Sequence, residues 1–336
     1  FIISCCTDEC KKMVGSYMRL DEEYRLSEYV DLGRLDDNEK VHIVRNKVNG
    51  VIGVRKYIAL DLEEIYLFLK ENPNPYIPKI YECIQTNTNL IVIEEYLSGK
   101  NLEEILKEKI FSEKDAADII ICLCNALYPL HNAKMPVICR DLKAENVILT
   151  NEGEVKLIDF DIARIYQPGK SKDTVMMGTQ GYAAPEQFGF GQTDARTDIY
   201  ALGVLLNYML VRDFPMEKLT EGKFKTIVLK CTKINPEDRY QNVDELKADI
   251  CNAAEIPCSS MDSDKNKFYC AQSCKKNQAG EIPFYKIPGF RTGKIWKMVV
   301  AVIGYALTTV TAWSLEAHDA NGKLLPQSKL TLERLV

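Results

Sequence analysis

The sequence contains little of what several protein classes require. Only three of its 336 residues are histidines, and His42, His131 and His318 lie far apart, which argues against a histidine-based metal site or nucleophile. The 18 glycines and 13 prolines are too few for a collagen-like or low-complexity chain, and 46% hydrophobic residues is too many for a mostly disordered one. We therefore expect a globular protein with a substantial core, whose chemistry depends on carboxylates and lysine.

The chain also has no excess of basic residues. It contains 43 lysines and arginines against 48 acidic residues, for a net charge of -5. Its surface as a whole therefore does not attract nucleic acid, and we do not expect a nucleic-acid partner. Any attraction to phosphate has to come from local groups.

The cysteines do not follow the pattern of a disulfide-stabilised secreted domain. There are 12 of them, scattered from Cys5 to Cys274, which indicates free thiols in a reducing compartment. The spacing of the last four is not that of a standard zinc site either; these are Cys251, Cys258, Cys270 and Cys274. We expect them to be ordinary cysteines of a linker.

Residues 21–97 have the pattern of a small, sheet-rich unit. From residue 24 to 60 strand-like runs are separated by turns, and Asn49-Gly50 between two apolar alternations predicts a hairpin. A helix-like stretch at 61–71 and two more strand-like runs, at 79–84 and 89–97, complete the unit.

Residues 98–253 have the pattern of a larger helical unit. The amphipathic segments lie at 101–108, 113–133, 197–210 and 242–253. We therefore expect one domain over 21–253, in which a sheet lobe (21–97) is followed by a helical lobe (98–253). Residues 1–20 precede the patterned sequence and are expected to be a disordered or non-native segment.

An uncharged run near the end of the chain predicts a membrane span. Residues 298–315 contain no charged side chain, and Trp296 and Trp313 flank the run as aromatic residues do at membrane interfaces. We expect a linker at 254–295, a transmembrane helix at 296–315 and a short tail at 316–336. The alternative is a buried core helix.

Basic residues suggest how this span would be oriented. Arg291, Lys294 and Lys297 lie just before it, which favours a cytoplasmic location for the N-terminal side. The expected location is the cell membrane, crossed once, with the globular domain in the cytoplasm.

One run, residues 138–164, carries four polar groups that suit phosphoryl transfer. Asp141 is followed by Lys143 and Asn146, and Asp159 ends an apolar strand. Phosphoryl transfer needs a carboxylate that orients the attacking hydroxyl, a cation for the γ-phosphate, and oxygen ligands for Mg²⁺. These four side chains provide that set.

The run resembles the catalytic loop and metal-binding segment of protein kinases. Residues 139–141 read Cys-Arg-Asp in place of His-Arg-Asp, and residues 159–161 read Asp-Phe-Asp in place of Asp-Phe-Gly. The spacing Asp-x-Lys-x-x-Asn is the serine/threonine-kinase form. A second run, 178–187, resembles the segment with the Ala-Pro-Glu motif, and the similarity extends over about residues 22–252.

The resemblance to bacterial serine/threonine kinases of eukaryotic type implies a fold and a set of partners. The implied fold is α+β and two-lobed, with a β-rich N-lobe and a helical C-lobe. The implied cofactors are ATP and Mg²⁺ or Mn²⁺, and the implied acceptors are serine or threonine hydroxyls of proteins.

The resemblance also implies roles for residues of the helical lobe. Asp141 and Lys143 would be catalytic and in contact with Thr179, whereas Asn146 and Asp159 would hold the metal. Three further residues would have structural roles: Glu186 would pair with Arg239, and Asp198 would brace the catalytic loop.

In the sheet lobe, the resemblance assigns the nucleotide site. Lys56 shares a strand face with Val54 and Ile58 and would hold the α- and β-phosphates, with Glu64 as its ion-pair partner and Glu63 as the alternative. Glu94 takes the gatekeeper position. The adenine would bind the backbone of Glu95 and Leu97 beneath Val41 and Val54.

Two departures from the family pattern concern the phosphates. Where kinases carry three glycines over the phosphates, this chain has only Gly33, followed by three acidic residues: Asp36, Asp37 and Glu39. Weak ATP binding, or a loop shifted away from the phosphates, is implied. Asp161 replaces a glycine and either tunes metal binding or faces solvent.

Regulation by phosphorylation is a further implication. Arg140 precedes the catalytic aspartate and could pair with a phosphate, for which Ser171 and Thr174 are the candidate acceptors. The alternative is that both are ordinary loop residues.

The leading hypothesis is a membrane-anchored serine/threonine protein kinase. A signal would reach it through dimerisation, a partner protein or the linker, so a homodimer is a further expectation. The rival is a pseudokinase that acts as a non-catalytic signalling or scaffold module, as the glycine-poor loop suggests. Kinases of small molecules share the fold but usually lack the Ala-Pro-Glu segment, which is present at 184–186.

Overall fold

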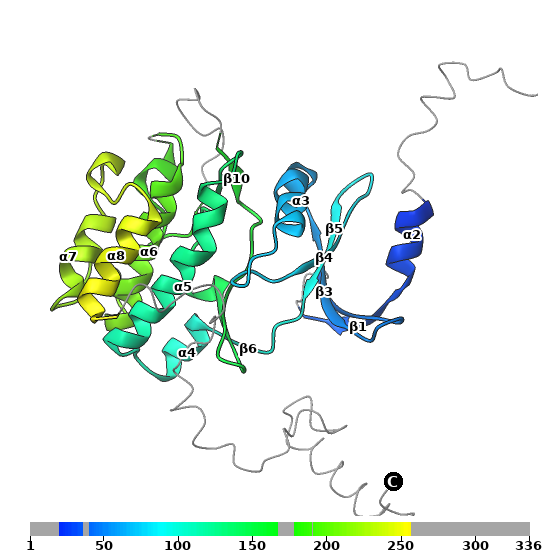
Figure 1. Ribbon diagram of the computed structural model, residues 1–336, viewed down its shortest axis with the longest axis horizontal. Coiled ribbons are helices and arrows are strands. Elements are labelled where there is room, and N and C mark those ends of the chain that lie inside the picture. Colours follow the sequence, from blue (N-terminus) through cyan, green and yellow to red (C-terminus); the bar gives the residue numbers. More distant parts are fainter. Residues whose placement is uncertain (1–19, 36–39, 167–177, 190, 257–336) are drawn as a thin grey trace, which may run out of the picture. The chain divides into compact units, whose positions relative to one another are not determined.

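The computed structural model describes residues 20–35, 40–166, 178–189 and 191–256. Within these ranges, most strands precede residue 97 and most helices follow it (Figure 1). The prediction of an α+β fold with a sheet lobe and a helical lobe is therefore confirmed for this part of the chain.

The sheet lobe is built on a five-stranded antiparallel sheet with the strand order β1-β2-β3-β5-β4. Its strands are β1 (Tyr29–Arg34), β2 (Val41–Asn46), β3 (Ile52–Ile58), β4 (Ile80–Gln85) and β5 (Leu90–Glu95). The predicted hairpin joins β2 and β3. In its turn Gly50 has a φ of 73°, which glycine adopts without the steric cost of a side chain.

Two helices belong to this lobe. Helix α3 (Glu63–Glu71) follows a 3-10 turn at Leu60–Leu62 and buries Ile65, Tyr66 and Leu69, as the apolar spacing of residues 61–71 predicts. Helix α2 (Leu20–Ser27) is a correction, because we expected a strand from residue 24. It has acidic residues in its first turn and buries none of its side chains, so its apolar residues gave no sign of its conformation.

The helical lobe contains α4 (Leu102–Glu108), α5 (Glu113–His131), α6 (Ala195–Val211), α7 (Phe224–Cys231) and α8 (Val243–Ala254). Helix α5 packs against α8, and α6 packs against α7 (Figure 1). The side chains of Ser112, Asp194 and Asn242 accept hydrogen bonds from first-turn amides of α5, α6 and α8. The sequence did not predict α7, whose eight residues give too short a periodic pattern.

Short strands hold the run at 138–164. A three-stranded sheet contains β6 (Gly99–Asn101), β8 (Val147–Thr150) and β9 (Val155–Leu157), and β7 (Val137–Ile138) pairs with β10 (Arg164–Ile165). Strand β7 leads into the predicted catalytic loop, and β9 leads to Asp159. Two pieces of sheet therefore fix both ends of the segment that carries the predicted chemistry.

The described residues contain no helix with the length and apolar character that a membrane crossing requires. The predicted span at 296–315 lies outside the described residues, as do the predicted linker after residue 256 and the tail.

The crossing of α6 and α7 provides a test of this packing. A Cβ atom added at Gly203 would overlap the Cβ of Cys231 on α7. We expect Gly203→Ala to lower the free energy of unfolding by about 1–2 kcal/mol, because overpacking outweighs the better helix propensity of alanine. Urea unfolding would measure this loss, with Lys225→Ala on the exposed side of α7 as the control. A more stable Gly203→Ala protein would contradict the close crossing.

Candidate active site

Four predicted catalytic residues lie together at one carboxylate. Thr179 Oγ1 donates to Asp141 Oδ1 over 2.6 Å, and Lys143 Nζ lies 2.7 Å from Asp141 Oδ2. Lys143 also donates to Thr179 Oγ1 at 3.0 Å, and Asn146 Nδ2 donates to the carbonyl oxygen and to Oδ2 of Asp141, each at 2.9 Å. The contact expected between Thr179 and the Asp141–Lys143 pair is therefore present.

These bonds also bear on a metal ion. Because Asn146 uses its amide nitrogen on Asp141, its amide oxygen remains the group that could coordinate a cation. Asp159 Oδ1 accepts the amide of Asp161 at 3.0 Å, which leaves its other oxygen. One amide oxygen and one carboxylate are too few ligands to bind Mg²⁺ by themselves. They are enough when the phosphates of a bound nucleotide supply further ligands. The donors thus fit the predicted cofactor.

Asp198 fixes the backbone just before Asp141. Its carboxylate is fully buried and accepts the amides of Cys139 and Arg140, at 3.0 and 2.9 Å. His131 Nε2 lies 2.7 Å from the same carboxylate. The expected bracing contact is present, whereas the part of His131 was not predicted and no sequence pattern marks it.

Two residues of the predicted site have a positive φ although neither is glycine. The φ angle is 68° at Arg140 and 70° at Asp159. Left-handed backbone costs an ordinary residue about 1–2 kcal/mol, so the surrounding bonds must compensate for it. At Arg140 they include the amide bond to Asp198 and a 2.8 Å bond from Gln187 Nε2 to the Arg140 carbonyl.

The segment with the Ala-Pro-Glu motif is anchored by a buried ion pair. Glu186 and Arg239 form two parallel hydrogen bonds of 2.7 and 2.9 Å, as expected, and their side chains are 6% and 0% exposed. Thr197 Oγ1 adds a 2.8 Å bond to Glu186. The neighbouring Gln187, whose role the sequence did not reveal, ties this segment to the catalytic loop.

Lys56 has a different partner from the predicted one. Its Nζ lies 2.6 Å from Glu94 Oε1, and the two side chains are 15% and 9% exposed. Burial alone would lower the pKa of Lys56, but the carboxylate of Glu94, with Asp159 and Asp161 nearby, raises it above the ordinary value. Lys56 is therefore held as a cation.

The prediction that Glu64 pairs with Lys56 is wrong. Glu64 is exposed on α3, while Ile65 and Tyr66 are the residues that this helix turns inward. Glu63, the alternative, is half-buried and close enough to Cys83 to raise the pKa of that thiol, an effect smaller than that of burial. Family spacing pointed to an acidic residue of the helix, but the helix presents its apolar face.

The expected apolar roof lies on the same sheet face as Lys56. Val41 is opposite Lys56 across the β2–β3 pair, and Val54 is two residues before it on β3. Glu95 ends β5 and its amide donates to the carbonyl of Lys79 at 2.8 Å, whereas Leu97 lies in the connection to β6. Their adenine-binding roles stay predictions.

The glycine expected over the phosphates lies in an irregular part of β1. Gly33 has a φ of 149°, and the register of β1 against β2 shifts between Asp31 and Gly33. The acidic residues 36, 37 and 39 lie outside the described residues, as do Ser171 and Thr174. The predicted phosphate loop and phosphorylation sites therefore stay predictions.

Asp161 contacts Tyr66 of the sheet lobe and the neighbouring Asp159 of the helical lobe. Desolvation of its carboxyl group and the negative charge of Asp159 raise its pKa to about 6, although part of the side chain stays accessible to solvent. Tyr66 donates from its hydroxyl to Asp161 Oδ1 over 3.4 Å. Helix α3 thus contacts the segment predicted to bind the metal through a tyrosine.

Cys139, which stands where kinases have histidine, behaves as a packing residue. It is 2% exposed, and burial together with Asp198 raises the pKa of its thiol well above the ordinary value. Its burial makes Cys139 a packing residue and not a reactive thiol.

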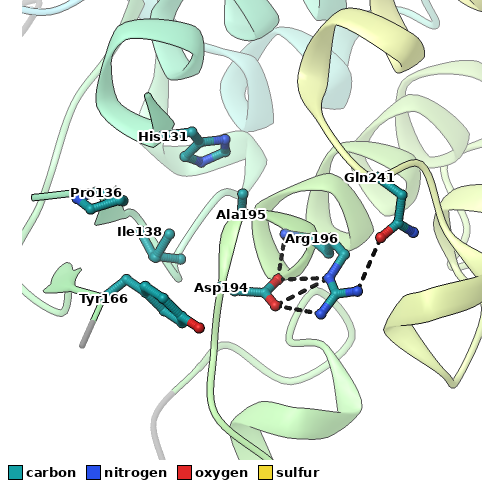
Figure 2. Close-up of a pocket in the computed structure, with 8 residues that line it drawn as sticks. All are labelled: His131, Pro136, Ile138, Tyr166, Asp194, Ala195, Arg196 and Gln241. Carbon is teal, nitrogen blue, oxygen red and sulfur yellow. Dashed lines mark hydrogen bonds and ion pairs between the residues drawn. The ribbon is translucent and has the colours of Figure 1, made fainter. Parts of the chain in front are cut away.

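Among the described residues, cavities also lie elsewhere in the helical lobe. Figure 2 shows one of about 270 Å³ beside His131, where Arg196 bonds to Asp194 and Gln241. A larger one of about 870 Å³, lined mainly by apolar side chains, lies between residues 180–188 and helices α6 and α7. Neither is lined by the residues around Asp141.

The Glu186–Arg239 pair should be a strong contributor to stability. Replacing Arg239 with leucine would leave a buried carboxylate without its partner, so we expect Arg239→Leu to cost about 3–5 kcal/mol. Replacing both residues with leucine should recover much of that loss. Urea unfolding would measure both, and Lys223→Ala, which breaks an exposed pair with Glu255, should leave the midpoint unchanged. Equal effects of Arg239→Leu and Lys223→Ala would contradict this assignment.

Comparison with known proteins finds similarity to serine/threonine-protein kinases. The chain is 31% identical over 190 residues to a probable serine/threonine-protein kinase PknB of Corynebacterium glutamicum, covering 47% of this chain and 29% of that protein. It is 31% identical over 199 residues to the serine/threonine-protein kinase PAK 1 of Mus musculus, covering 59% and 35%. To the serine/threonine-protein kinase PknB of Mycobacterium tuberculosis it is 28% identical over 272 residues, covering 69% and 43%.

The chain thus spans less than half the length of these curated relatives. The family model for the protein kinase domain matches residues 41–278, so it reaches past the predicted domain end at 253. The matched residues include Asp141 with its partners Lys143, Asn146 and Thr179. They also include strand β3, which carries Lys56, and the Glu186–Arg239 ion pair. Because the match covers more than half of the sequence, the chain belongs to the protein kinase domain family.

Proposed function

We propose that this protein is an ATP-dependent serine/threonine protein kinase. The observation that carries the proposal is the cluster in which Asp141 accepts bonds from Thr179, Lys143 and Asn146. The relatives named above are serine/threonine-protein kinases by name, which is in line with the Ser/Thr form predicted for residues 141–146.

In this mechanism Asp141 orients the acceptor hydroxyl and takes its proton. The 2.6 Å bond from the Thr179 hydroxyl illustrates that Oδ1 can accept from an alcohol at this position. Lys143, 2.7 Å from Oδ2, supplies a cation next to the transferring phosphoryl group. Lys56, buried and charged, would bind the α- and β-phosphates.

The residues that would hold the metal are Asn146 and Asp159. When bound with ATP, Mg²⁺ or Mn²⁺ would neutralise charge that develops on the phosphates. The chain's own contribution is to hold these two oxygen donors in place, through the Asn146 bonds to Asp141 and the left-handed backbone of Asp159.

Substitution of Asp141 tests the proposal directly. Asp141→Asn keeps the shape of the side chain but cannot accept the proton, so we expect transfer from ATP to a protein substrate to fall at least about 100-fold. Nucleotide binding, measured as the rise in melting temperature with ATP and Mg²⁺, should be retained. Intact mass of the full chain would follow the phosphate gained, and peptide mapping would locate it, with Ser171 and Thr174 as expected sites.

The control for this test is Asp244→Asn, an exposed aspartate at the start of α8. It should transfer phosphate at the parent rate. Parent-level transfer by Asp141→Asn would contradict the assigned role. A folded parent that neither transfers phosphate nor is stabilised by nucleotide would instead support the pseudokinase hypothesis.

A second part of the proposal is that residues 296–315 anchor the protein in the cell membrane, with the kinase domain on the cytoplasmic side. It is supported by the uncharged run at 298–315 and by the basic residues before it. In this arrangement, dimerisation in the membrane would be one way to bring two kinase domains together.

Deletion of residues 298–315 tests the anchor. The full chain should remain with the membranes after alkaline carbonate extraction, because a spanning helix is not held by charge, whereas the deleted protein should be soluble. An equally long deletion, of residues 316–333, should leave the protein in the membrane fraction. Soluble full-length chain would contradict the anchor.

A further inference from the structure

The ion pair of Lys56 arises from the register of the sheet. Strand β3 pairs with β5 so that Val54 is opposite Glu94 and Lys56 is opposite Val92. Side chains of directly opposite residues share one face, so Lys56 and Glu94 are diagonal neighbours on it. Both side chains are long enough to meet there, at 2.6 Å.

No carboxylate of α3 competes for Lys56 in this arrangement. The helix turns Ile65, Tyr66 and Leu69 toward the interior. Glu64 is exposed, and the half-buried Glu63 lies close to Cys83 and forms no ion pair with Lys56 among the described residues. The inward polar group of the helix is the Tyr66 hydroxyl, which reaches Asp161 instead. Glu94 is thus the only carboxylate within ion-pair distance of Lys56 among the described residues.

We propose that Glu94 is the positioning residue that holds Lys56 for the phosphates of the nucleotide, in place of an acidic residue on helix α3. This inference rests on the proposed kinase function. Its basis is the close, largely buried pair and the fact that both residues lie on adjacent strands of one sheet.

The chemistry of the pair allows this role. A lysine ammonium has three hydrogens, so a bond to Glu94 leaves two donors for phosphate oxygens. A buried lysine without a partner would lose its charge or leave the site, because burial disfavours the charged form. Glu94 therefore keeps the cation where the phosphates would need it.

The position of Glu94 has a mechanical consequence. Strands of one sheet are fixed relative to each other by their backbone ladder, and β3 and β5 pair from Gly53 to Ile58. The orientation of Lys56 then does not depend on how α3 is placed. Substituting the exposed Glu64 of α3 should accordingly lower kcat/KM for ATP far less than substituting Glu94.

Steady-state kinetics of the full chain test the role. Glu94→Gln keeps the volume but removes the charge, and we expect kcat/KM for ATP to fall about 10- to 100-fold, with KM for the protein substrate unchanged. Glu94→Asp keeps the charge on a shorter side chain and should recover part of the loss. Glu71→Gln, on the exposed end of α3, is the matched control and should equal the parent.

Chemical modification of Lys56 provides a readout that does not need catalysis. Without Glu94 the ammonium loses its nearest anion, so at fixed pH more of the amine is neutral and reacts with acetic anhydride. We expect Lys56 in Glu94→Gln to be acetylated faster, by about tenfold for each unit by which its pKa falls. Peptide mass spectrometry would compare Lys56 with Lys225, an exposed lysine, in parent, Glu94→Gln and Glu71→Gln.

Three outcomes would overturn the inference. One is a Glu64→Gln protein that loses as much kcat/KM for ATP as Glu94→Gln, since the helix would then supply the partner. Another is a gain in ATP affinity in Glu94→Gln, since Glu94 would then compete with the phosphates. The third is a Glu94→Gln protein in which Lys56 is acetylated at the parent rate.

The two proposals can fail separately. If the parent transfers no phosphate, the kinase function fails, while the acetylation of Lys56 still reports whether Glu94 holds it. If Glu94→Gln does not fold, Glu94→Asp still tests the pair, because it retains the charge. A smaller loss of kcat/KM for ATP in Glu94→Asp than in Glu94→Gln would support the inference.

Discussion

The buried carboxylate of Asp198 is the contact on which the predicted active site depends. It lies near the start of α6 and accepts two consecutive backbone amides, those of Cys139 and Arg140, while His131 of α5 approaches the same oxygen as the first of them. A fully buried carboxylate needs several such partners to offset its loss of hydration. Because the backbone before Asp141 supplies these partners, the fold connects two core helices to the side chain proposed as catalytic.

From that point the site is held by a short chain of bonds. Gln187 reaches the Arg140 carbonyl from the segment anchored by Glu186 and Arg239, and Thr179 reaches Asp141 from the beginning of that segment. The catalytic loop and the segment across from it therefore constrain each other. Only the contacts of Gln187 and Thr179 separate the Glu186–Arg239 ion pair from the loop that carries Asp141.

The sequence predicted the two lobes and most of the contacts around Asp141. It did not predict the partner of Lys56, which depends on strand pairing, or two helices whose sequences carry no clear apolar pattern. Motif spacing grouped Asp141, Lys143 and Asn146 because phosphoryl transfer needs such side chains together, and the family resemblance added Thr179; the structure brings all four together. It assigned Lys56 to Glu64 because the family pattern uses the helix. The pairing of β3 with β5, which a linear pattern does not contain, gives Lys56 a neighbour in Glu94 instead. Helices α2 and α7 were missed because one buries no side chain and the other is short.

The left-handed backbone at Arg140 and Asp159 sets a limit on how stable this protein can become. These are positions where glycine would relieve torsional strain, and in a protein selected for stability alone they would be natural sites for it. Arg140, however, directly precedes Asp141, the proposed catalytic carboxylate, and Asp159 is itself a proposed metal ligand. The chain therefore carries a cost in folding free energy at two positions of the proposed active site. Selection of a variant library for thermal resistance alone would favour glycine at these two positions. Each such substitution would alter the proposed active site.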